Sequence, residues 1–319
     1  QKCIPSPVSK RCINPFVPAN FLYSPAVDTA FGDGAWDAFL ALHPGADPEG
    51  WVASVEKQQQ RGPFRVNVDA PNFHSAENFL VSNITTFYLG NDMQIRNIIG
   101  YTHMKSSNAS EFDGTPFPSD DNGTEGRGGT LEQFSEEIQL LGEAFDGQLS
   151  YVTGLYYSDE KDQTLSVSKL FDLSPAAPEV TQVNDGETSN ETYAGYAQGT
   201  LDLDNIVGVE GLALTLGGRY SSEEVSFLRG PEDVFIANPA PEGAVFLNPL
   251  SDSFDQFSWT IGLQQEVNDE LLLYANSRRS FRSGGFNYFA PPLAGFGNDG
   301  GSEYQEETAT DLELGAKFK

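Results

Sequence analysis

Apolar and polar side chains alternate along most of the chain after residue 62, and the pattern is clearest between residues 253 and 266. There Phe257, Trp259, Ile261 and Leu263 are separated by small or polar residues. A period of two puts successive side chains on opposite faces of an extended strand. The pattern therefore predicts a strand whose two faces meet different environments.

The same alternation recurs along the chain and predicts about nine strands. Their expected ranges are 79–89, 93–104, 134–144, 148–157, 193–203, 212–222, 253–266, 271–282 and 304–319. Short connections of about three residues, such as 145–147 with its Asp-Gly pair, alternate with long polar ones of about 25 to 30 residues, such as 105–129 and 158–190. Outer-membrane barrels show this rhythm of short turns and long loops, whereas sandwiches mix loop lengths. The sequence therefore predicts an all-β, antiparallel up-and-down barrel segment.

Residues 1–61 do not show the strand pattern and are expected to form a separate loop or subdomain, with 62–319 forming the partial barrel. Short helices are predicted at about 36–42 and 49–60, the second begun by Asp47-Pro48. The Pro-rich spacing of Cys3 and Cys12 favours a disulfide outside the cytosol over a metal site. Two interpretations stay open: a surface loop over a pore mouth, or a small packed subdomain without a ligand.

Charge narrows the choice of partners. The chain has 46 acidic and 18 basic residues and a formal net charge of −28. Such a chain repels nucleic acid, so nucleic-acid binding is excluded. No run of about 18 apolar residues is present for a membrane helix, but barrel strands need only about 10 alternating residues.

Several stretches in order resemble the barrel of TonB-dependent outer-membrane receptors. They are 136–140 (EEIQL), 151–157 (YVTGLYY), 193–198 (YAGYAQ), 216–220 (LGGRY), 283–287 (SGGFN) and 304–317, which ends in LELGAK. The resemblance covers roughly residues 73 to 319. It implies short periplasmic turns, long extracellular loops, a bacterial outer-membrane location and uptake of a scarce nutrient such as a ferric siderophore, vitamin or glycan.

The resemblance also implies partners: a small-molecule or metal-chelate ligand, membrane lipid, and the TonB energy-coupling protein in a full-length parent. The family's plug domain and TonB-engaging box are not found here, and family barrels have 22 strands. We therefore expect a central piece of a larger receptor, which alone would be soluble or prone to aggregation.

Candidate ligand contacts lie near the last predicted hairpin. Arg278 and Arg282 could form a basic patch for an anionic ligand, or could pair with carboxylates such as Glu306, Glu307 and Asp311 on the next strand. The nearby aromatic residues Tyr288, Phe289 and Phe296 could stack on a ligand or belong to a membrane-interface girdle.

Catalytic signatures are sparse, so we expect no enzymatic activity and no cofactor. The histidines His43, His74 and His103 lie in different predicted segments. Residues 119–125 (SDDNGTE) look like an acidic calcium loop without full EF-hand spacing, and a solvated loop is the simpler interpretation. The alternative to a receptor is an autonomous secreted β protein acting as a hydrolase or carbohydrate binder.

Overall fold

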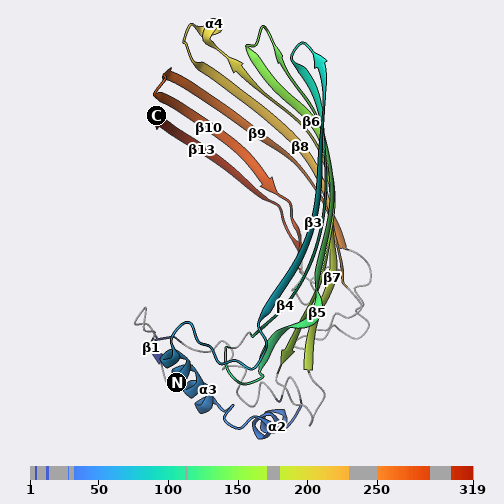
Figure 1. The fold of residues 1–319 in the computed structure, drawn as a ribbon, viewed down its shortest axis with the longest axis vertical. Coiled ribbons are helices and arrows are strands. Elements are labelled where there is room, and N and C mark those ends of the chain that lie inside the picture. Colours follow the sequence, from blue (N-terminus) through green and yellow to red (C-terminus); the bar gives the residue numbers. More distant parts are fainter. Residues whose placement is uncertain are drawn as a thin grey trace.

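A single nine-stranded antiparallel sheet dominates the computed structural model (Figure 1). The structure describes residues 4–5, 12–13, 28, 32–111, 114–170, 180–229, 250–287 and 303–318. Strands neighbouring in sequence are neighbours in the sheet, in the order β13-β10-β9-β8-β7-β6-β5-β4-β3. The up-and-down arrangement predicted from the alternating pattern is therefore confirmed.

The strands are considerably longer than the alternation indicates. Their bounds are β3 (Phe73–Gly90), β4 (Met93–Glu111), β5 (Asp120–Ala144), β6 (Leu149–Leu170), β7 (Val180–Asp202), β8 (Leu212–Arg229), β9 (Leu250–Asn268), β10 (Leu271–Arg282) and β13 (Glu307–Phe318). The prediction that 105–129 and 158–190 are loops is thus wrong for much of each segment. Backbone hydrogen bonds continue the ladder there although the side chains are mostly polar, because sheet pairing does not itself require apolar residues.

All four short connections lie at one end of the sheet, the upper end in Figure 1. Asn91 and Asp92 both have positive φ (52° and 59°), as do Phe145 and Asp146 (both 55°) in the next turn. Two consecutive residues of this kind match the right-handed twist of the flanking strands. The third connection contains the short helix α4 (Asp204–Val207), and the β9–β10 connection closes the hairpin on which the alternation was clearest.

The helices α2 (Ala35–Leu42) and α3 (Pro48–Arg61) lie at the opposite end, near the ends of β4 and β5 (Figure 1). Asp47 caps α3, because its Oδ1 accepts a hydrogen bond from the Gly50 N–H at 2.8 Å. Phe39 (0% exposed) and Trp51 (1%) are buried, and Trp51 stacks on Phe117 at 6.1 Å between ring centroids. The two predicted helices are confirmed, and they pack with the loop that precedes β5.

Small two-stranded pairings complete the described chain. They are β1 (Ile4–Pro5) with β2 (Cys12–Ile13), and β11 (Gly285–Phe286) with β12 (Glu303–Tyr304). Phe286 stacks on the buried Phe227 of β8 at 6.4 Å, so β11 folds against the sheet beside β8. None of the helices in the described part of the chain has the length and hydrophobicity to cross a membrane.

Candidate functional site

The register of the nine strands separates the side chains into two faces of different chemistry. Directly opposed residues share a face, so the ladder Ile138–Leu155–Gly195–Tyr220–Phe257 runs across β5 to β9 on what we call the apolar face. The other side, the polar face, carries the residues between them. Apolar side chains on the first face are widely exposed, Leu155 at 69% for example, so no part of the described chain covers them.

One aromatic residue from each of seven adjacent strands forms a row across the apolar face. We call this set the aromatic row: Phe79, Tyr101, Phe134, Tyr157, Tyr193, Tyr220 and Phe257. Neighbouring rings approach each other, with centroids 6.4 Å apart for Phe79–Tyr101 and 5.0 Å for Tyr157–Tyr193. Such a row of amphipathic rings is typical of a membrane–water interface.

The composition of the apolar face changes at the aromatic row. Toward the long-loop end the row is followed by ionisable residues: Glu77, His103, Glu132, Asp159, Glu191, Glu224 and Asp255. Toward the short turns the face is mainly aliphatic, as from Tyr220 to Leu212 on β8. Those eight steps span about 26 Å at 3.3 Å per residue, close to the apolar band of about 25 Å on outer-membrane barrels.

The polar face holds a hydrogen-bonded cluster near its centre. Tyr196 of β7 donates its hydroxyl to Glu137 Oε1, and Gln139 Nε2 donates to both Tyr196 Oη and Glu137 Oε1 at 3.0 Å each. Arg219 of β8 completes the cluster, with its guanidinium carbon 5.1 Å from the ring centroid of Tyr156 and 5.9 Å from that of Tyr196. We call these five residues the β5–β8 cluster.

Arg219 differs in its partners from Arg278, the arginine on the polar face of β10. Its Nε donates to Ser221 Oγ at 3.0 Å, and its remaining described contacts are the two aromatic rings. No carboxylate among the described residues forms an ion pair with it. Arg219 borders an open cavity of about 460 Å³, also lined by Glu137, Tyr196 and Arg278. The Arg219 guanidinium thus borders this space stacked on two aromatic rings and without an ion pair to any described carboxylate.

Glycines opposite tyrosines shape the polar face. Tyr196 lies directly opposite Gly154, and a Cβ on Gly154 would come 2.7 Å from the Tyr196 ring and 2.8 Å from the Ile138 carbonyl oxygen. Tyr274 covers Gly315 in the same way, with a closest approach of 2.3 Å. A ring can lie flat on the sheet only where its cross-strand neighbour lacks a side chain. Gly154 therefore sets the position of Tyr196.

Arg278 lies on the polar face and is paired, as one of the two sequence interpretations expected. Its Nη2 lies 3.2 Å from Asp311 Oδ2 and 3.1 Å from Glu313 Oε2 on β13. Asp311 was expected as a partner, whereas Glu313 was missed. Arg282 lies at the end of β10, opposite Glu307 and exposed.

Other predicted residues fall outside the described part of the chain. Tyr288, Phe289 and Phe296 belong to this group, as do Cys3 and the Cys12 side chain. The aromatic loop contacts and the disulfide therefore stay predictions. Whether the last loop contributes to an aromatic girdle therefore also stays a prediction, while the aromatic row on the strands is the arrangement that the described residues form.

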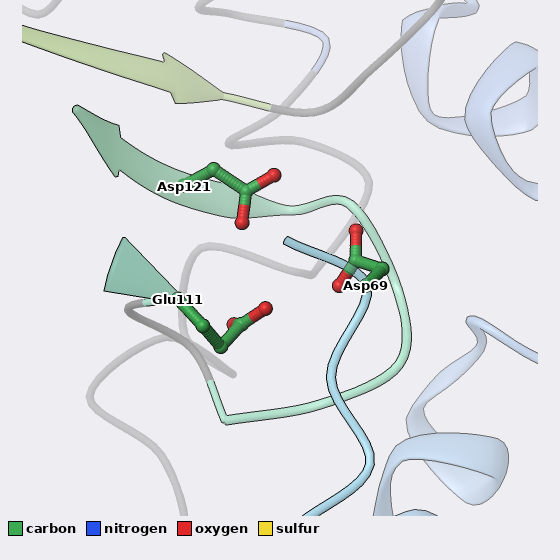
Figure 2. Close-up of side chains that lie close together, drawn as sticks. All are labelled: Asp69, Glu111 and Asp121. Atoms are coloured by element: carbon green, nitrogen blue, oxygen red, sulfur yellow. The ribbon is translucent and has the colours of Figure 1, made fainter. Parts of the chain in front are cut away.

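Three carboxylates gather at the long-loop end of β4 and β5 (Figure 2). One oxygen each from Asp69, Glu111 and Asp121 lies within 4.8 Å of the others. Glu111 accepts hydrogen bonds from the Gly114 N–H at 2.9 Å and the Ala70 N–H at 3.5 Å. Such a set of hard oxygen ligands could hold Ca²⁺ or Mg²⁺. Asp121 belongs to the acidic segment 119–125 that the sequence singled out. Asp69 and Glu111 lie outside that segment, and no sequence motif links them to it.

Burial raises the pKa of the Glu111 carboxyl above its ordinary value, and the nearby charge of Asp69 adds to this effect. Glu111 lies ten residues beyond Tyr101 on β4, roughly 33 Å further along the strand than the aromatic row. The carboxylate group therefore belongs to the part of the sheet beyond the apolar band.

The histidines are dispersed. His43 follows α2 and contacts Phe39 at 4.8 Å between ring centroids, and His74 lies on β3. His103 Nδ1 lies 3.2 Å from Glu132 Oε1 on the exposed apolar face. The described residues thus bring no two of these histidines into one catalytic group.

The family model described as "TonB dependent receptor-like, beta-barrel" matches residues 15–319. The chain belongs to this family. The two-faced sheet is accordingly a piece of a TonB-dependent receptor barrel wall, with the apolar face outward and the polar face toward the lumen. Family members reside in the outer membrane, and full-length members take up small molecules and engage TonB.

Solved receptor structures have the same fold. The ferric yersiniabactin uptake receptor FyuA from Yersinia pestis is 17% identical with a TM-score of 0.57, over 77% of this chain and 33% of the receptor. The siderophore receptor PiuA from Acinetobacter baumannii is 15% identical with a TM-score of 0.56, over 77% of this chain and 38% of the receptor. The ferric-catecholate import receptor Fiu from E. coli K12 is 13% identical with a TM-score of 0.55, over 82% and 41%. The chain thus spans between a third and two fifths of these receptors.

Proposed function

We propose that this chain forms part of the wall of an outer-membrane receptor that imports a scarce nutrient, with a ferric chelate as the favoured substrate class. The family assignment supports receptor function, and the three similar receptors are named for ferric or siderophore ligands. The proposal rests mainly on one observation: the sheet has an exposed apolar face on one side and a polar face that presents Arg219 on the other.

Arg219 is the best-placed described residue for an anionic ligand in the lumen. Its guanidinium is half-buried, stacked on two tyrosines and free of any described carboxylate partner. Arg278, by contrast, is largely compensated by Asp311 and Glu313. Arg278 and Arg282, with the aromatic residues of the last loop, remain a proposed second contact region nearer the loops.

The test is uptake of radiolabelled iron by iron-limited cells that express the receptor containing this chain. Ferric chelates of the catecholate and hydroxamate classes serve as probes. Removing a charged hydrogen-bond donor costs about 1.5–3 kcal/mol, so Arg219→Ala is expected to lower uptake of the cognate chelate at least tenfold.

The matched control is Lys105→Ala, since Lys105 is opposite Glu77 on the apolar face of β4 and does not line the cavity beside Arg219. Uptake by this control should match that of the unmodified receptor at equal surface abundance. Equal uptake by the Arg219→Ala receptor, or no uptake of any ferric chelate by the unmodified receptor, would count against the proposal.

A further inference from the structure

Contacts within the wall hold the Arg219 guanidinium and leave its terminal edge for a ligand. Its Nε donates to the hydroxyl of Ser221, a side chain that is only 2% exposed. The rings of Tyr156 and Tyr196 lie beside the guanidinium carbon, at 5.1 and 5.9 Å from their centroids. Among the described residues no hydrogen bond or ion pair reaches the two terminal nitrogens. The four N–H donors on this edge are therefore free for a ligand in the cavity that Arg219 lines.

This edge is matched to a planar anion with two oxygens. The two terminal nitrogens of a guanidinium donate parallel hydrogen bonds to both oxygens of one carboxylate, which a lysine ammonium does not do. Because Ser221 and the two tyrosine rings already restrict the side chain, less conformational freedom is lost when the ligand binds. The geometry favours recognition by shape as well as by charge.

A carboxylate in the same cavity limits the charge of the anion. Glu137 lines the cavity and accepts hydrogen bonds from the Tyr196 hydroxyl and from Gln139 Nε2. Arg278, which also lines it, is already paired with two carboxylates of β13. Repulsion between like charges grows with the product of the charges. A doubly charged phosphate is therefore disfavoured here more than a singly charged carboxylate.

Neutral hydrogen-bonding groups line the cavity next to Arg219. Ser258 lies directly opposite Arg219 on β9, and Thr260, Gln198 and Ser280 line the cavity as well. Hydroxyl and amide groups both donate and accept hydrogen bonds. They suit a hydroxyl carried beside the carboxylate of the ligand. In catecholate and hydroxamate chelates both oxygens of each group coordinate iron, so these chelates lack a free carboxylate for the guanidinium.

We propose that the Arg219 cavity selects ferric chelates that carry a free carboxylate beside a hydroxyl, as ferric hydroxycarboxylates do. The carboxylate is bound end-on by the two terminal nitrogens of Arg219, and the hydroxyl lies against Ser258 or Thr260. The inference rests on the proposed function and adds to it the chemical group by which the chelate is recognised.

The test measures binding to the purified receptor containing this chain by titration calorimetry. The probes are ferric citrate, ferric enterobactin and ferrichrome, which represent the hydroxycarboxylate, catecholate and hydroxamate classes. We expect ferric citrate to bind at least about tenfold more tightly than the other two, and inorganic phosphate not to displace it. Tighter binding of either other chelate, or displacement by phosphate, would overturn the inference. A receptor that binds none of the three would contradict the proposed function itself.

Arg219→Lys separates the shape of the guanidinium from its charge. Lysine keeps the positive charge but not the two parallel donors, so ferric citrate should bind at least about tenfold more weakly. The matched control is Arg61→Lys at the end of α3, which should bind ferric citrate as the unmodified receptor does. Full affinity of the Arg219→Lys receptor would refute end-on recognition of a carboxylate.

Ser221 is a positioning residue in this account, because it acts through Arg219. Ser221→Ala releases Nε and should weaken ferric citrate binding about threefold. In an Arg219→Lys background the same change should have no further effect, because lysine has no Nε donor. Ser222→Ala, opposite Tyr193 on the apolar face, is the control and should be neutral in both backgrounds. An equal loss in both backgrounds would show that Ser221 does not act through Arg219.

Discussion

Replacing Gly154 with alanine tests whether a missing side chain positions the β5–β8 cluster. The new Cβ would lie 2.7 Å from Cζ and Oη of Tyr196 and 2.8 Å from the Ile138 carbonyl oxygen. These distances are well inside van der Waals contact, so the tyrosine ring must move off the sheet. The ring would then leave its hydrogen bonds with Glu137 and Gln139.

Two effects contribute to the loss of stability that we expect for Gly154→Ala. Overpacking of this kind costs about 1–3 kcal/mol, and each lost hydrogen bond about 1 kcal/mol. Because the cluster is only half-buried, we expect Gly154→Ala to lower the free energy of unfolding by about 2–4 kcal/mol in total. The measurement is guanidinium unfolding of the purified receptor, followed by circular dichroism.

Gly195→Ala is the matched control. Gly195 lies on the adjacent strand, and its nearest neighbour would be 3.6 Å from the new Cβ. Its effect should stay within about 0.5 kcal/mol. In a Tyr196→Ala background the cost of Gly154→Ala should fall by at least half. If Gly154→Ala proves as mild as the control, the proposed link between Gly154 and Tyr196 is refuted.

Three further changes probe other parts of the chain. Trp51→Ala should destabilise the helical segment by about 3–5 kcal/mol, because the side chain is 1% exposed; limited proteolysis would show early cleavage within 35–61, and unchanged protection would contradict the packing. Arg278→Ala should leave the guanidinium unfolding midpoint almost unchanged, because both ion pairs are exposed; a large drop in the midpoint would be inconsistent with this. Since the folded pKa of Glu111 is raised, its ionisation destabilises the fold as pH rises through that value. Glu111→Gln should therefore be more stable than the unmodified receptor at neutral pH, with the difference vanishing toward pH 4.5, and a pH-independent difference would contradict the shift.

The strand order and the two faces could be predicted from the sequence because burial against lipid imposes a strict period of two. On β8, Leu212, Leu214 and Leu216 alternate with smaller or polar residues within the apolar band. Beyond the aromatic row both faces meet water, so the pattern fades although the ladder continues. That is why residues 158–170 of β6 were expected to be a loop.

The site could be predicted only where partners lie on adjacent strands with a clear register. The Arg278–Asp311 pair is of this kind, since β10 and β13 are both short and pair without a register shift. Tyr196 of β7 contacts Glu137 of β5 across the intervening strand β6. The approach of Asp69 to Glu111 depends on how the segment before β3 packs against the end of β4. Neither leaves a local signal in the sequence.

The most direct test of the two-faced wall compares two adjacent positions on β8. Leu214 lies opposite Leu201 and Leu263 on the apolar face, and Thr215 opposite Thr200 and Gly262 on the polar face. Each is replaced by cysteine, in a background with Cys3 and Cys12 changed to serine, and labelled with an environment-sensitive fluorophore after reconstitution into vesicles. We expect spin-labelled lipid to quench the Leu214→Cys label and aqueous iodide to quench the Thr215→Cys label. Equal quenching of both labels by either agent would refute the two-faced wall.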